Sequence, residues 1–137
     1  MNAVDTNILL YAHDPRAPEK QDAATTLIQE LRDGVLLWQV ACEYLAASRK
    51  LAPLGYSLDG AYEDLLDLRH AWFTALPTWA TLDRGWELMQ RHGLSFWDAT
   101  LVAASLDAQV TQLFSEDFGA PREIEGLRIV NPFKNGS

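Results

Sequence analysis

The chain alternates short apolar runs with longer amphipathic segments, and this alternation restricts the folds open to it. We expect helices over residues 19–33, 40–51, 57–73, 81–92 and 95–107. We expect short strands over residues 3–5, 35–38, 76–79, 110–114 and 127–130. Strands that alternate with helices favour parallel crossovers, so the sequence predicts a three-layer α/β sandwich.

Length and composition narrow the class of protein further. The 137 residues fit a single domain spanning residues 1–137. The longest charge-free stretch, residues 71–82, is shorter than the about 20 apolar residues that span a membrane, so we expect no membrane association. The one cysteine, Cys42, cannot form an internal disulfide, which favours a cytoplasmic location. A net charge of −8 argues against a broad basic surface for nucleic acid.

Four acidic residues fall at corresponding places in the predicted elements. Asp5 and Asp117 each follow a predicted strand, and Glu43 and Asp98 each lie near the start of a predicted helix. In a parallel sheet, the carboxyl ends of strands and the amino ends of helices share one edge. We therefore expect these four residues, which are far apart in sequence, to lie together.

Gathered carboxylates repel one another, and a bound divalent cation relieves that repulsion. Ligands that are all oxygen favour Mg²⁺ or Mn²⁺ over zinc. Such a cation can orient a phosphodiester, activate a water molecule and stabilise the leaving oxygen. The sequence contains no Gly-rich phosphate loop and no serine-hydrolase elbow to support another chemistry.

The segment around each acid is also typical of ordinary local structure. In chain order, these alternatives are a turn at residues 5–7 with Thr6 as a helix cap, an ion pair of Glu43 with Lys50, a helix cap at Ser95, and a turn at residues 115–117. The joint placement of the four acids at one edge favours a shared site over four separate explanations.

Four motifs in register resemble those of PIN-domain ribonucleases, specifically the VapC-type toxins of bacterial toxin–antitoxin pairs. They are DTNILLYAHD at 5–14, the glutamate of ACEYL at 41–45, SFWDATLVAA at 95–104 and LFSEDF at 113–118. The resemblance runs through essentially the whole chain. It implies a PIN-like sandwich with about five parallel strands, a homodimer, and a small antitoxin partner that blocks the site.

The resemblance also implies an activity and assigns residues to it. It implies Mg²⁺- or Mn²⁺-dependent cleavage of RNA phosphodiesters by Asp5, Glu43, Asp98 and Asp117. The metal ligands that the resemblance implies are Asp5, Asp98 and Asp117, with Asp117 favoured over the adjacent Glu116. The positions that support these ligands are Thr6, Asn7, Ser115 and Glu116.

Several alternatives stay open from the sequence. Arg16, Lys20 and Arg122 are the basic residues that the topology brings near the acidic edge, where they contact RNA or simply form a solvated face. An RNA-processing nuclease outside toxin–antitoxin systems, or a non-catalytic protein-binding module with a structural cation, also fits the motifs. The sequence does not identify the RNA, the cleavage position, the number of metal ions or the antitoxin.

Overall fold

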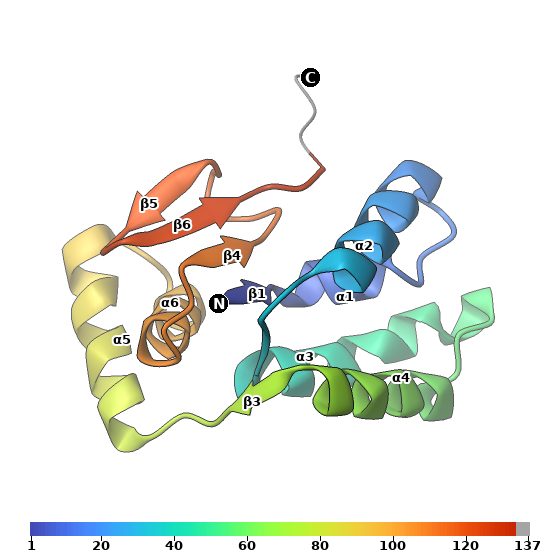
Figure 1. Ribbon diagram of the computed structural model, residues 1–137, viewed down its shortest axis with the longest axis horizontal. Helices are drawn as coiled ribbons and strands as arrows, with labels where there is room; N and C mark the ends of the chain where they lie inside the picture. Colours follow the sequence, from blue (N-terminus) through green and yellow to red (C-terminus); the bar gives the residue numbers. More distant parts are fainter. Residues whose placement is uncertain (134–137) are drawn as a thin grey trace.

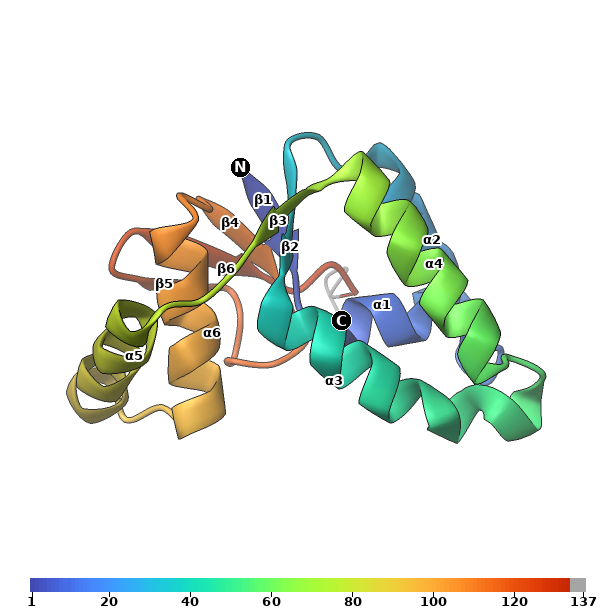
Figure 2. The ribbon, with the colours of Figure 1, turned by 90° about the horizontal axis from the view of Figure 1, so that it is seen from below.

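A six-stranded sheet forms the centre of the molecule, and helices pack on both of its faces (Figures 1 and 2). The computed structural model describes residues 1–133. In chain order its elements are β1 (Asn2–Val4), α1 (Thr6–Tyr11), α2 (Pro18–Glu30), β2 (Gly34–Leu37), α3 (Trp38–Ser48), the 3₁₀ helix η1 (Arg49–Leu54), α4 (Leu58–Ala71), β3 (Phe73–Ala75), α5 (Trp79–His92), α6 (Phe96–Asp107), β4 (Gln112–Phe114), β5 (Arg122–Ile124) and β6 (Leu127–Val130).

The strand order is β3-β2-β1-β4-β6-β5. All pairs are parallel except β5 with β6, which is antiparallel. The predicted three-layer sandwich is therefore confirmed. The expected sheet of about five parallel strands is present and gains one antiparallel strand at its edge.

The topological switch point of the sheet is at β1, which lies between β2 and β4. Helices α1 to α4 connect β1 through β2 to β3 on one side of β1, and α5 and α6 return the chain to β4 on the other side. Right-handed crossovers then put the two sets of helices on opposite faces of the sheet. Figure 2 shows this separation, with α5 and α6 packed together and apart from α1 to α4.

The central strands are buried on both faces, as expected for parallel strands covered by helices. Ala3 of β1 pairs with Val35 of β2 and Leu113 of β4, and each of the three residues is at most 1% exposed. Within residues 1–133, none of the helices combines the length and the hydropathy that crossing a bilayer requires.

The strand predicted at residues 76–79 is wrong, and the preceding helix is shorter than predicted. Helix α4 ends at Ala71 because Trp72 is extended and its ring lies over Gly34, where a Cβ atom would be 2.6 Å from the ring. The strand β3 follows at once. Thr78 and Thr81 then form a capping box that begins α5 at Trp79, inside the segment predicted as a strand.

The edge strand β5 has no counterpart in the prediction. It joins β6 through a tight hairpin in which Glu125 and Gly126 have φ values of 52° and 91°. Positive φ at both central residues is typical of the turns that link two-stranded hairpins. The predicted strands at 35–38 and 127–130 and the helix at 95–107 agree with β2, β6 and α6 within one residue at each end.

Candidate functional site

The candidate site lies at this topological switch point, at the carboxyl ends of β1 and β4. Asp5 follows β1, and its backbone N–H donates to the carbonyl of Phe114 at the end of β4, at 2.8 Å. Ser115 is the next residue and is fully buried. In open α/β sheets, ligands bind in the crevice at such a switch point.

Asp5 is a buried carboxylate, 7% exposed, held by two hydrogen bonds. Its Oδ1 accepts from the backbone N–H of Thr6, and its Oδ2 accepts from the Ser115 hydroxyl, both at 2.7 Å. Burial raises the pKa of Asp5 to about 6. The two hydrogen bonds lower this pKa, whereas the nearby charges of Asp117 and Glu43 raise it. The site therefore holds excess negative charge at neutral pH.

Asp117 is positioned from both sides by polar contacts. Its backbone N–H donates to Ser115 Oγ at 3.0 Å, and its Oδ2 accepts from Asn7 Nδ2 at 3.2 Å. Burial raises the pKa of the Asp117 carboxyl, the charges of Asp98 and Glu116 raise it further, and the Asn7 contact lowers it. Asp98, in the first turn of α6, is thus close enough for its charge to act on Asp117 across the site.

Glu43 lies on α3 at the opposite side of the site. It is exposed, and its Oε1 accepts from the Thr6 hydroxyl at 3.3 Å. In the described part of the chain, no ion pair joins it to Lys50, so the alternative interpretation of this residue is not supported.

The caps next to the acids follow the sequence only in part. Ser95 caps α6 as expected, with its Oγ accepting from the Asp98 N–H at 3.1 Å. The cap of α1 is Asp5 itself, not Thr6. Asp5 therefore serves two purposes: it begins the helix and lies in the acidic site.

The four acids surround one region, and their contacts and charges link them in the order Glu43, Asp5, Asp117 and Asp98. No three His, Cys, Asp or Glu side chains of residues 1–133 converge closely enough to hold one ion. The donor set is nonetheless suited to a hard cation. The groups available are carboxylate oxygens. In addition, Asn7 Oδ1 is a buried acceptor with no partner among the described residues.

Glu116 points away from the four acids, toward α2. Its carboxylate forms an ion pair with Lys20 and accepts from the Tyr11 hydroxyl at 2.8 Å. Asp117, by contrast, contacts Asn7 within the site. Of the two adjacent acids, Asp117 is therefore the one placed with Asp5 and Asp98.

The basic residues near the site are largely paired with acids. The Arg16 guanidinium donates to both carboxylate oxygens of Asp14 at 2.9 Å, and Lys20 pairs with Glu116. Arg122 has no ion pair among the described residues. Two of these three basic residues, which either contact RNA or form a solvated face, thus have their charge neutralised by a neighbour.

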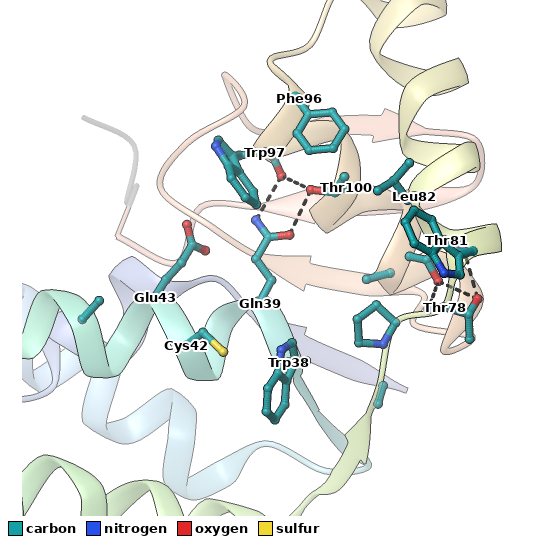
Figure 3. A pocket seen from close by; sticks show the side chains of 15 residues that line it. Trp38, Gln39, Cys42, Glu43, Thr78, Thr81, Leu82, Phe96, Trp97 and Thr100 are labelled. Carbon is teal, nitrogen blue, oxygen red and sulfur yellow. Dashed lines mark hydrogen bonds between the residues drawn. The ribbon is translucent and has the colours of Figure 1, made fainter.

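A groove of about 780 Å³ opens beside the acidic site, between α3 and the α5–α6 pair. Glu43 and Trp97 both line it, and Figure 3 shows them near each other, with Trp38 at the start of α3. Gln39 and Thr100 bridge the two walls through a hydrogen bond of 3.0 Å. Trp38, Trp79 and Trp97 are 52%, 80% and 65% exposed. Sequence reasoning did not locate this groove because it forms between distant helices.

The fold is an α/β sandwich, and acidic residues from separate segments lie around its topological switch point. The family model described as the PIN domain matches residues 3–122, so the chain belongs to the PIN domain family. The resemblance inferred from the four motifs is confirmed. Comparison with curated proteins gave no match.

Solved structures share this fold at low sequence identity. A toxin–antitoxin complex from Klebsiella pneumoniae matches with a TM-score of 0.70 and 17% identity, covering 96% of this chain and 98% of that one. VapC20 of Mycobacterium tuberculosis, a sarcin–ricin loop cleaving toxin, matches with a TM-score of 0.69 and 19% identity, covering 93% and 99%. VapBC2 of Rickettsia felis, bound to a promoter DNA fragment, matches at 0.64 and 14%, covering 93% and 96%.

Proposed function

We propose that this protein is a metal-dependent endoribonuclease and the toxin of a type II toxin–antitoxin pair. The observation that supports the proposal is that the charges of Asp5, Glu43, Asp98 and Asp117, from four distant segments, act on one another pairwise around the switch point of a PIN domain. The similar solved structures include a VapC toxin and toxin–antitoxin complexes, matched over nearly their full length, which supports the toxin assignment.

The chemistry follows from the donor set. Bound Mg²⁺ or Mn²⁺ would supply charge stabilisation to a phosphodiester and lower the pKa of a water molecule. Asp5, Asp98 and Asp117 would hold the cation, with Glu43 at the edge of the site. Ser115 and Thr6 keep the Asp5 carboxylate fixed in one orientation, and Asn7 does the same for Asp117. Such supporting contacts orient metal ligands and tune their affinity.

The substrate side of the proposal rests on charge. The protein carries a net charge of −8, and Arg16 and Lys20 are paired with acids. Non-specific binding to polyanions depends on unpaired basic residues. We therefore propose that the enzyme recognises a particular RNA shape, and a binding affinity that does not change with RNA fold would contradict this.

Incubating partner-free protein with total cellular RNA tests the activity directly. The incubations contain Mg²⁺, Mn²⁺ or EDTA, with Asp98→Asn as the inactive variant. Asp107→Asn is a matched control, because Asp107 ends the same helix and pairs with Arg84 at the surface. Discrete fragments that require metal and Asp98, but not Asp107, are expected. Wild-type protein that binds metal but cuts no RNA would favour the non-catalytic binding module.

We also propose two protein partners, a second copy of the chain and a cognate antitoxin. The exposed large apolar side chains of the groove region support the second copy. Five of them are between 41% and 80% exposed: Trp38, Leu76, Trp79, Leu82 and Trp97. With a full side-chain area of about 200 Å² each, these fractions correspond to roughly 600 Å² of exposed apolar surface. A standard interface buries about 800 Å² per partner. Sedimentation of wild type and Trp79→Asp tests this pairing, and an unchanged monomeric mass in both would contradict it.

The antitoxin separates the toxin from an RNA-processing nuclease of the same family. Growth arrest on expression of the chain alone, relieved by the product of a neighbouring reading frame, is expected for a toxin. Harmless expression of an active enzyme would favour the processing nuclease. The cytoplasmic location and the single-domain organisation stay predictions.

A further inference from the structure

Lys20, in the first turns of α2, makes contacts that the proposed chemistry does not use. Its ammonium group forms an ion pair with Glu116 and lies 3.3 Å from the Tyr11 hydroxyl. The same nitrogen lies 4.7 Å from the centre of the Tyr11 ring and 5.6 Å from that of Phe133, within the range of cation–π attraction. The two rings meet edge to face at 5.0 Å. Lys20 is thus held in a defined position and does not extend freely into solvent.

Both oxygens of the Glu116 carboxylate are engaged by this arrangement. Oε2 contacts Lys20, and Oε1 accepts from the Tyr11 hydroxyl at 2.8 Å. The contacts tie together segments about 100 residues apart in sequence. They also keep the Glu116 carboxylate directed toward α2 and away from the four acids.

Glu116 lies in the chain between two residues of the candidate site. On one side, the Ser115 hydroxyl donates to Asp5 at 2.7 Å and also accepts the Asp117 N–H at 3.0 Å. On the other side, Asp117 accepts from Asn7. Anchoring the middle residue therefore fixes the backbone that sets the direction of its two neighbours.

We propose that Lys20 is a positioning residue for the acidic site. It holds Glu116 against α2 so that Asp117 faces Asn7 and Asp98. The inference rests on the proposed metal-dependent function, because the property that it affects is cation affinity. Lys20 does not touch the cation or the substrate in this account.

A purely electrostatic role for Lys20 predicts the opposite result. Removing a positive charge near a cluster of carboxylates makes the cluster more negative, which tightens the binding of a cation. Removing an anchor lets Asp117 leave its position and weakens that binding. The sign of the change in affinity therefore separates the two roles.

The test is a titration of the purified protein with Mn²⁺ alone, with the binding affinity measured by calorimetry. Lys20→Met removes the charge and keeps most of the aliphatic stem, and Lys20→Arg keeps an ion pair with Glu116. Lys50→Met is the matched control, because Lys50 is exposed and has no ion pair among the described residues. Loss of a contact that supports a metal ligand weakens affinity about ten- to a hundredfold. Lys20 acts through Glu116, which is not a ligand, so we expect Lys20→Met to lose affinity at the lower end of this range, about tenfold, with near wild-type affinity for Lys20→Arg and no loss for Lys50→Met.

A second variant keeps the test independent of any single substitution. In the Lys20→Met background, Glu116→Gln should add little further loss, because both changes break the same contact. Circular dichroism establishes that each variant is folded at the temperature of titration, and Lys20→Gln replaces Lys20→Met if the latter is not.

Unchanged or tighter Mn²⁺ binding by Lys20→Met would overturn the inference, and so would a wild type that binds no Mn²⁺. Wild-type protein that binds Mn²⁺ but cleaves no RNA would refute the proposed activity. In that case the role of Lys20 would still be decided by the affinities.

Discussion

The Asp5→Asn substitution is expected to stabilise the metal-free protein at neutral pH. Asp5 is 7% exposed, and burial is the main cause that raises its pKa from 3.8 to about 6. Asparagine has nearly the same shape and no charge. Its Oδ1 can accept the Thr6 N–H, and its Nδ2 can donate to Ser115 Oγ, so both contacts of the carboxylate have a replacement.

The magnitude follows from the pKa difference between the folded and unfolded states. Each pKa unit corresponds to about 1.4 kcal/mol, so ionised Asp5 lowers the free energy of unfolding by about 3 kcal/mol at pH 7. Below about pH 4 the carboxyl is protonated in both states and this penalty is absent. Between about pH 4 and 6 the folded state retains a proton that the unfolded state has released, so stability falls as pH rises. Above about pH 6 the penalty is constant.

Urea unfolding in EDTA from pH 4 to pH 8 measures this effect in wild type and Asp5→Asn. The difference between the two curves isolates Asp5, because the other titrating groups are common to both proteins. We expect a difference of about 0.5 kcal/mol at pH 4 that grows to about 3 kcal/mol in favour of the variant at pH 7. Mn²⁺ should stabilise the wild type and narrow the gap. A variant less stable than wild type at pH 7 in EDTA would refute the reasoning.

Three further substitutions test the contacts around the site and the packing of the helices. Ser115→Ala removes an O–H donor and should raise the pKa of Asp5 further, which carboxyl NMR titration measures; an unchanged pKa would contradict this. Gly85→Ala puts a Cβ atom 2.8 Å from Thr100 Cγ2 and should destabilise the protein by about 1–3 kcal/mol in urea unfolding, whereas helix propensity alone predicts a gain. Tyr56→Phe removes a hydroxyl that bonds a buried tyrosine and a carboxylate, and should lower thermal stability by about 1–3 kcal/mol; an unshifted midpoint would show that this network contributes little.

The sequence predicted the parts of the fold that depend on burial and capping. Val35, Leu36 and Leu37 are apolar and buried, Leu127 and Ile129 are the buried positions of β6, and Ser95 marks the start of α6 by its hydrogen bond. The strand β3 lacks such a signal. Phe73 is 61% exposed. This short edge strand therefore lacks the continuous apolar, buried run that would distinguish it from the helix before it.

Parallel topology brings strand ends and helix starts to one edge, which is why the sequence could predict that the four acids approach one another; that they share one cation stays a prediction. The contacts between them were not predictable. The Lys20–Glu116 pair joins residues far apart in sequence, and it depends on the direction of side chains at the ends of α2 and β4. The alternation of strands and helices carries no information at that level of detail.

Mn²⁺ titration of Asp98→Asn beside Asp107→Asn decides whether acids from separate segments form one cation site. The two substitutions make the same chemical change at opposite ends of α6. We expect wild type and Asp107→Asn to bind Mn²⁺ with equal affinity and Asp98→Asn to bind at least about tenfold more weakly. Equal affinity of all three proteins, or no binding by any of them, would contradict it.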